Sequence, residues 1–166
     1  MSPKSSKLPA LLIAGAAGLV AGAAYDRLGR FEISEASMTP ALRPGDYVLT
    51  LRVPGPPNRG EVVVFEHPDR PSFYLVKRII GLPGERLSIE RGRIHLDGKP
   101  LDEPWTTDET GPDGKWELNS EEAFVLGDAR WMSSGDSREI GPVPLEHTNM
   151  RVVFRYWPFG RLGRVH

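Results

Sequence analysis

Two patterns of hydrophobic and polar residues divide the chain near residue 26. Residues 8–25 carry no charged side chain and consist mainly of Ala, Leu and Gly. As a helix rising about 1.5 Å per residue, this segment is about 27 Å long, close to the thickness of a bilayer core. From residue 26 onward, short β-branched and aromatic runs are separated by Gly and Pro. The pattern therefore predicts a membrane-spanning helix followed by a β domain.

The second part of the chain predicts strands, and no long amphipathic helix is expected in it. Its short runs of alternating or fully apolar residues lie at 47–53, 61–66, 73–80, 86–90, 93–96, 123–126 and 150–156. Asp97 and Gly98 stand between residues 94–96 and 99–101 and predict a tight hairpin, because this turn needs positive φ angles. Residues 108–115 are polar and typical of an exposed loop. The expected fold class is mostly β.

Charges on either side of the apolar segment predict its orientation. Lys4 and Lys7 precede it, and positive charge favours the cytoplasmic side. We therefore expect a cytoplasmic tail at 1–7, a transmembrane anchor at 8–25 and an extracytoplasmic β domain at 26–166, in a single-pass protein of the cell membrane. The alternative is a cleavable signal peptide, since Ala21-Gly22-Ala23 is an A-x-A pattern behind an apolar stretch.

Composition excludes several other classes of function. The 166 residues include 21 basic and 22 acidic side chains, so no positive excess predicts a nucleic-acid partner. The absence of cysteine excludes disulfides and thiol nucleophiles. The four histidines show no paired-ligand spacing, so the sequence indicates no metal.

Ser37 begins the first segment that could carry chemistry. It stands before Met38, Thr39 and Pro40, with a turn shortly after them. A serine beside a proline-containing turn is usually a loop residue that forms local hydrogen bonds. A catalytic interpretation therefore needs a base from elsewhere in the chain.

Lys77 is the candidate for that base. It lies within a strand-like run of bulky apolar residues, where a lysine either extends to solvent from an edge strand or loses its hydration. Desolvation lowers the pKa of a lysine, and a neutral amine can take the proton of a serine hydroxyl. Arg78 is expected on the opposite face of the strand, and a guanidinium does not deprotonate in proteins.

A third polar segment, 127–138, contains Asp128, Ser134, Asp136 and Arg138. Taken alone, it is typical of a turn with an Asp/Arg pair. In a functional interpretation, a serine hydroxyl there orients the lysine amine, while the carboxylates and the arginine hold the loop. The residues alone leave both interpretations open.

Four segments, in this order, resemble the motifs of bacterial type I signal peptidases, also called leader peptidases. SMTPAL at 37–42 is similar to the serine box S-M-x-P-T-L, and RGEVVVF at 59–65 to the strand R-G-D-I-V-V-F. VKRIIGLPGE at 76–85 resembles the lysine box K-R-x-x-G-x-P-G-D. GDAR at 127–130 and SGDSREIGPVP at 134–144 together resemble G-D-N-x-x-x-S-x-D-S-R-x-x-G-x-V. The resemblance extends over roughly residues 33–154.

The resemblance implies a signal-peptidase-like β catalytic domain behind one N-terminal transmembrane helix. It implies a serine endopeptidase with Ser37 as nucleophile, Lys77 as general base and Ser134 as the hydroxyl that orients the lysine. Its structural supports would be Asp128, Asp136 and Arg138. The amide of Ser37 would contribute to the oxyanion hole. The partners implied are the signal peptides of exported preproteins and the lipid bilayer; no cofactor is needed, and we expect a monomer.

Three departures from the family pattern keep alternatives open. Glu35 stands where members carry serine or glycine, so a hydroxyl donor to the oxyanion hole does not transfer. Ala129 replaces an asparagine of the family pattern. The gap between GDAR and SGDSR is one residue longer than in that pattern, so Ser133 is an alternative to Ser134 as the hydroxyl that orients the lysine. The alternatives are a maturation protease of the same family dedicated to one secreted or pilus-type protein, and an inactive membrane-tethered β binding module. Self-cleaving Ser/Lys repressors are disfavoured because the chain has an anchor and no DNA-binding segment.

Overall fold

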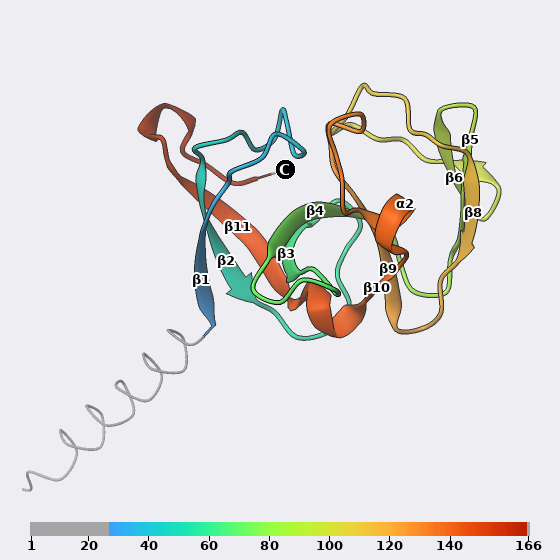
Figure 1. Ribbon diagram of the computed structural model, residues 1–166, viewed down its shortest axis with the longest axis horizontal. Helices are drawn as coiled ribbons and strands as arrows, with labels where there is room; N and C mark the ends of the chain where they lie inside the picture. Colours follow the sequence, from blue (N-terminus) through green and yellow to red (C-terminus); the bar gives the residue numbers. More distant parts are fainter. Residues whose placement is uncertain (1–26, 166) are drawn as a thin grey trace, which may run out of the picture.

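Two antiparallel β-sheets form the part of the chain that the structure, a computed structural model, describes, residues 27–165 (Figure 1). The larger sheet has seven strands in the order β1-β2-β11-β3-β4-β9-β10. Its strands are β1 (Leu28–Glu32), β2 (Tyr47–Arg52), β3 (Val62–Glu66), β4 (Tyr74–Gly81), β9 (Glu122–Leu126), β10 (Val143–Pro144) and β11 (Met150–Trp157). The smaller sheet has the order β7-β6-β5-β8.

The smaller sheet is built on a tight hairpin. Its strands are β5 (Arg86–Glu90), β6 (Arg93–Leu96), β7 (Lys99–Pro100) and β8 (Gly114–Glu117). Asp97 and Gly98 join β6 to β7 with φ angles of 47° and 79°, as the sequence predicts. Positive φ at both turn positions matches the right-handed twist of the flanking strands.

Short helical turns connect the remaining segments. They are the α-helix α2 (Ser137–Ile140) and the 3₁₀ helices η1 (Leu145–Asn149) and η2 (Phe159–Arg161). Asp136 caps α2, because its side chain accepts a hydrogen bond from the Arg138 amide. No helix in residues 27–165 is long and apolar enough to cross a membrane. The predicted anchor at 8–25 and the tail at 1–7 lie outside the described residues.

Apolar side chains pack in three groups, and one of them joins the two sheets. Ile80, Phe124 and Leu126 of the larger sheet pack with Leu87 and the other apolar residues of the smaller sheet. Gly81 lies in this contact: a Cβ there would lie 2.7 Å from a methyl carbon of Leu118. A side chain at this position would therefore force the sheets apart.

The expectation of a mostly β fold is confirmed, with differences at the edges of the sheets. All seven predicted strands are present, with boundaries shifted by at most one residue. The strands β1, β8 and β10 were not predicted, and β7 was expected only as the second arm of the hairpin at Asp97 and Gly98. The loop predicted at 108–115 is wrong at its end, because Gly114 begins β8 and pairs with Ile89. Backbone pairing with β5 decides the conformation there, although the sequence of the segment is polar.

Candidate active site

Ser37 and Lys77 meet in a buried contact between two distant segments. Ser37 lies in the loop after β1 and is 5% exposed, whereas Lys77 lies in β4 and is 1% exposed. The Nζ of Lys77 donates a hydrogen bond to the Oγ of Ser37 over 3.1 Å. This geometry brings a hydroxyl and an amine into direct contact away from bulk water.

Backbone hydrogen bonds join the two ends of the loop that carries Ser37, and buried apolar side chains pack the loop against the larger sheet. The Ile33 amide donates to the Asp46 carbonyl over 2.8 Å, and the Gly45 amide donates to the Ile33 carbonyl over 2.8 Å. Met38 and Leu42 pack in one buried apolar group together with Val48 of β2 and Val64 of β3. The Ala129 amide donates to the Ser37 carbonyl over 3.0 Å, which ties the serine to the loop after β9.

Burial gives Lys77 the property that a base needs. Loss of hydration lowers the pKa of the Lys77 amine below its ordinary value of 10.5, while the carboxylates of Asp136 and Glu35 oppose the shift. Because burial outweighs the attraction of these carboxylates, the neutral amine is favoured relative to a lysine in water. A neutral amine next to a serine hydroxyl can accept its proton.

Arg78, the next residue in β4, points to the other face and carries a buried ion pair. Its Nε and Nη2 atoms each donate to a different oxygen of Asp128 over 2.7 Å. Both side chains are 1% exposed, and the guanidinium lies 5.2 Å from the centre of the Trp105 ring. Burial raises the pKa of Asp128, and the two bonds from Arg78 oppose that rise. Asp128 thus supports β4 from the face opposite to Lys77.

Asp136 organises the loop after β9. Arg138 donates to it through Nε over 3.0 Å and through Nη2 over 2.8 Å, and the Ser133 hydroxyl donates over 2.6 Å. Burial alone would raise the pKa of Asp136, but these hydrogen bonds hold it below its usual value. The carboxylate therefore stays charged within electrostatic reach of Lys77.

The two adjacent serines of this loop have different surroundings. Ser134 is exposed, and within residues 27–165 no hydrogen bond joins its hydroxyl to Lys77. Ser133 lies beside the nucleophile segment: a Cβ on Gly127 would be 2.4 Å from the Ser133 hydroxyl oxygen and 2.6 Å from the Ser37 carbonyl oxygen. The structure thus brings Ser37, Lys77 and the Asp136–Arg138 pair together, and the serine that bonds Asp136 is Ser133.

A narrow pocket of about 70 Å³ opens beside the Ser37–Lys77 pair. Residues 31–35 form one wall, and residues 73–77 form the other. β1 is the outermost strand of its sheet, and β4 pairs with β9 only from Arg78 onward. In the described chain, β1 up to Glu32 and β4 up to Lys77 therefore each have one edge without a strand partner, and residues 33–35 continue the first wall as a loop. The rings of Phe31 and Tyr74 meet across it, 5.4 Å apart.

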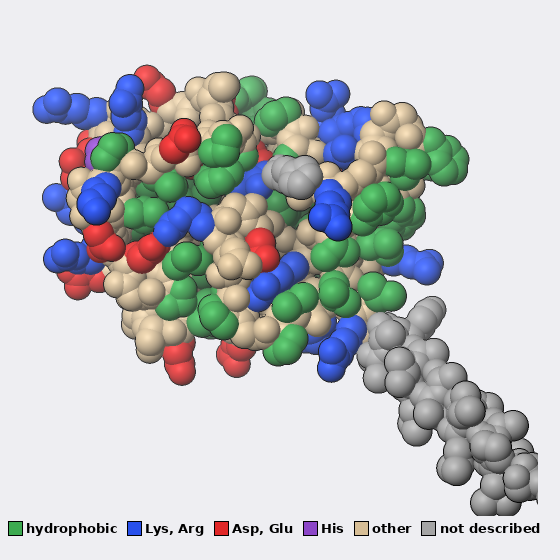
Figure 2. Space-filling model, turned by 180° about the vertical axis from the view of Figure 1, so that it is seen from behind, with side chains coloured by type: hydrophobic (Ala, Val, Ile, Leu, Met, Phe, Trp, Pro, Cys, Tyr) green, Lys and Arg blue, Asp and Glu red, His purple; other side chains and the backbone are tan. Residues whose placement is uncertain are grey.

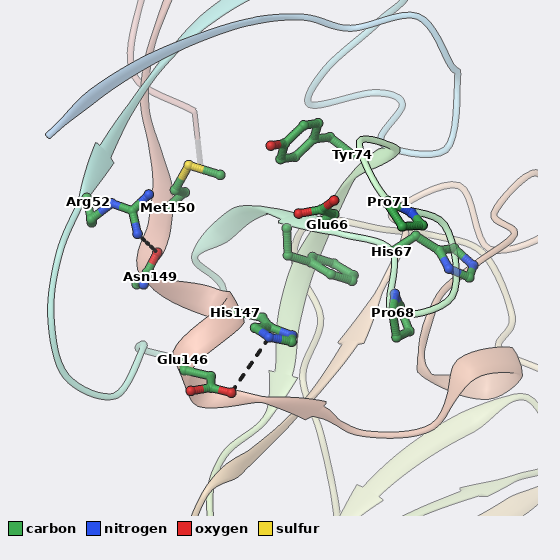
Figure 3. A pocket seen from close by; sticks show the side chains of 11 residues that line it. Arg52, Glu66, His67, Pro68, Pro71, Tyr74, Glu146, His147, Asn149 and Met150 are labelled. Atoms are coloured by element: carbon green, nitrogen blue, oxygen red, sulfur yellow. Dashed lines mark hydrogen bonds and ion pairs between the residues drawn. The ribbon is translucent and has the colours of Figure 1, made fainter. Parts of the chain in front are cut away.

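A larger cavity of about 310 Å³ lies on the other side of Tyr74 (Figure 3). His67 and His147 line it together with Glu66, Arg52 and neighbouring residues, but neither Ser37 nor Lys77 does. Within the described residues, no group of three or more His, Asp or Glu side chains is arranged to hold a metal ion. Ser37 and Lys77 lie instead beside the smaller pocket.

Arg130 is a supporting residue that the motifs contain but that was not predicted as one. It is 2% exposed and forms an ion pair with Glu103. Its Nε donates to the Gly127 carbonyl over 2.9 Å, which fixes the start of the loop that contacts Ser37. The GDAR motif contains this arginine, but its carboxylate partner lies 27 residues earlier, beyond any local pattern.

Comparison with known proteins agrees with this architecture. A sequence model of the family "Signal peptidase, peptidase S26" matches residues 7–157. Signal peptidase I of Leptolyngbya laminosa is 34% identical over 98% of this chain and 81% of its own length. Signal peptidase I of Bacillus caldolyticus is 35% identical over 78% of this chain and 79% of its own length.

Similarity extends to a plant protein and to a solved structure. A mitochondrial ATP-independent inner membrane protease subunit 1b of Arabidopsis thaliana is 34% identical over 76% of this chain and 69% of its own length. The crystal structure of a signal peptidase I from Enterococcus faecalis matches 60% of this chain and 97% of its own, with a TM-score of 0.52 and 24% identity, which supports the fold. The chain belongs to the signal peptidase family, peptidase S26, and is a serine endopeptidase.

Proposed function

We propose that this chain removes signal peptides from exported preproteins with Ser37 as nucleophile and Lys77 as general base. The observation that carries the proposal is the 3.1 Å hydrogen bond between the two side chains, both buried in one pocket. A serine needs a base within hydrogen-bond reach, and a desolvated lysine can act as that base without a histidine.

The reaction follows from the positions of these groups. The neutral Lys77 amine takes the proton of Ser37 as its Oγ attacks the scissile carbonyl, and the resulting ammonium then protonates the leaving amine. Lys77, neutral again, deprotonates a water molecule that attacks the ester carbonyl, and the proton returns to Ser37 as the ester bond breaks. In the described chain the Ser37 amide donates no hydrogen bond, which leaves it available to the oxyanion.

The walls of the pocket favour an extended peptide with small side chains. The free edges of β1, at residues 31–32, and of β4, at residues 74–77, can pair with a substrate strand placed between them. The narrowness of the pocket favours a small residue such as alanine beside the cut bond. Preproteins with A-x-A sites have this character.

The expected setting is the extracytoplasmic face of the cell membrane, with a single anchor at 8–25 and a monomeric catalytic domain. An apolar surface formed by Tyr47, Tyr156, Trp157 and Phe159 supports contact with lipid. The side chains of Trp157 and Phe159 are 44% and 72% exposed, and hydrophobic side chains gather at this end of the molecule in Figure 2. Aromatic residues of this kind partition to the headgroup region.

The experiment that tests the proposal is cleavage of a preprotein with an A-x-A site by the full chain in detergent. We expect wild-type protein to cut after the A-x-A, as mapped by mass spectrometry. We expect Ser37→Ala to be inactive and Ser120→Ala, an exposed serine outside the pocket, to match wild type. No cleavage of several such preproteins by folded wild-type protein would contradict the proposal and favour a dedicated maturation substrate or a binding module.

A further inference from the structure

The C-terminal segment contacts the loop that carries Ser37 through three charged side chains, Asp46, Arg155 and Arg161, which we call the C-terminal clasp. The Nη1 of Arg161 donates to one oxygen of Asp46 over 2.9 Å, and Arg155 lies 3.5 Å from the other oxygen. The Asp46 side chain is 2% exposed. The two arginines compensate the charge of this buried carboxylate, which also accepts a hydrogen bond from the Arg43 amide over 2.9 Å.

The same arginines also hold the backbone of the nucleophile loop. Arg155 donates to the Ala41 carbonyl over 2.7 Å, and Arg161 donates to the Pro40 carbonyl over 3.3 Å. Pro40 and Ala41 lie three and four residues after Ser37. In Figure 1 the chain after β11 turns back and lies beside this loop. The clasp therefore contacts the loop in its middle, at Pro40 and Ala41, as well as at its end, at Asp46.

An apolar contact reinforces the clasp. Val165 packs against the group of buried residues that contains Met38 and Leu42. The Arg155 backbone pairs with Gly163, and the Arg155 side chain donates to the Arg161 carbonyl, so the segment folds back on β11. The match to the family model ends at residue 157, before η2.

We propose that Arg161 is a positioning residue which, through Asp46, holds the nucleophile loop so that Ser37 stays within reach of Lys77. The inference rests on the proposed Ser/Lys function. The loop has no strand or α-helix of its own between β1 and β2, so its contacts decide where Ser37 lies. A displacement of about 1 Å between reacting groups can lower a rate by about 100-fold.

The test compares Arg161→Met and Arg161→Lys with Arg164→Met in cleavage of an A-x-A peptide. Arg164 is an exposed arginine in the same segment and serves as the matched control. We expect Arg161→Met to lower kcat by about 10- to 100-fold with KM changed less than threefold. Arg161→Lys, which keeps the charge, should recover part of the loss, and Arg164→Met should match wild type. Assays run well below the Tm of each variant, so that loss of folded protein does not contribute.

A double-mutant cycle shows whether Arg161 acts through Asp46. If it does, Asp46→Asn combined with Arg161→Met lowers kcat no further than the more damaging single change. Wild-type kcat in Arg161→Met, or fully additive losses in the double variant, would overturn the inference. If Arg161→Met fails to fold, the Arg161→Lys and Asp46→Asn pair gives the same comparison. A wild-type enzyme that leaves the peptide intact would instead contradict the proposed function.

Discussion

Lys77 donates a hydrogen bond to Ser37 on one face of β4, while the next residue of the strand is engaged on the other face by an ion pair. The alternation of side chains in a strand gives these neighbours opposite directions. One cation, Arg78, is fully compensated by Asp128, and the other depends on a hydroxyl and on more distant carboxylates. The strand therefore contains a permanently charged structural residue beside a lysine that can lose its proton.

The dependence of activity on pH should report Lys77. Burial lowers the pKa of its amine below 10.5, and the reaction requires the neutral form. The value of kcat/KM should therefore rise with pH and level off below the ordinary pKa of a lysine. A profile measured between about pH 5 and pH 10 checks this. A kcat/KM value that still rises in proportion to hydroxide concentration at about pH 10 would show that the Lys77 amine is not desolvated in the free enzyme.

Removal of the Glu35 charge should move that acid limb to lower pH. Its carboxylate, after Asp136, favours the protonated form of Lys77. In Glu35→Gln the amine should lose its proton more readily, so a larger fraction of enzyme is active on the acid side. Glu117→Gln, at an exposed position of β8, is the control and should leave the profile in place. A shift of the limb to higher pH in Glu35→Gln would contradict the assignment.

Loss of Asp128 should destabilise the domain strongly. Asp128→Ala removes the carboxylate that balances the buried Arg78 guanidinium, and breaking a buried pair costs about 3–5 kcal/mol. Chemical denaturation should show this loss. Glu90→Ala, which removes an exposed pair with Lys115, should cost at most about 1 kcal/mol. Equal effects of the two changes would mean that the Arg78–Asp128 pair is not a structural support.

The two serines of the loop after β9 can be separated by substitution. The family register assigns the lysine-orienting hydroxyl to Ser134, but the hydroxyl that reaches Asp136 belongs to Ser133. We expect Ser133→Ala to lower kcat about tenfold or more, since it removes a hydrogen bond to a charged group next to the site. Ser134→Ala should have a smaller effect. A larger loss of kcat in Ser134→Ala than in Ser133→Ala would instead support Ser134 as the hydroxyl that orients the lysine.

Much of the fold could be predicted because its inner strands have an apolar pattern. β3 and β4 contain runs of Val, Ile and Leu, and their boundaries were found within one residue. β1 was missed because it is an edge strand with alternate residues exposed, and its sequence, LGRFE, has the composition of a loop. Such strands form through pairing with a neighbour, which a local pattern does not contain.

The residues of the candidate site also fall into those that sequence motifs identify and those that only contacts in space identify. Ser37 and Lys77 stand in motifs with a characteristic order, so they were found although 40 residues separate them. The insertion before Ser134 shifts the loop by one position, and only contacts in space separate the two serines. The pairings of Glu103 with Arg130 and of Asp46 with Arg161 join segments far apart in sequence, with no motif to link them.

The most direct test of the Ser/Lys mechanism is the cleavage rate of Lys77→Met on a preprotein with an A-x-A site. Methionine replaces the buried amine with an apolar group of similar length, so the variant should fold at least as stably as wild type. Lys99→Met, at an exposed lysine of β7, is the matched control. We predict no detectable cleavage by Lys77→Met and wild-type cleavage by Lys99→Met. Substantial cleavage by well-folded Lys77→Met would show that another group is the base.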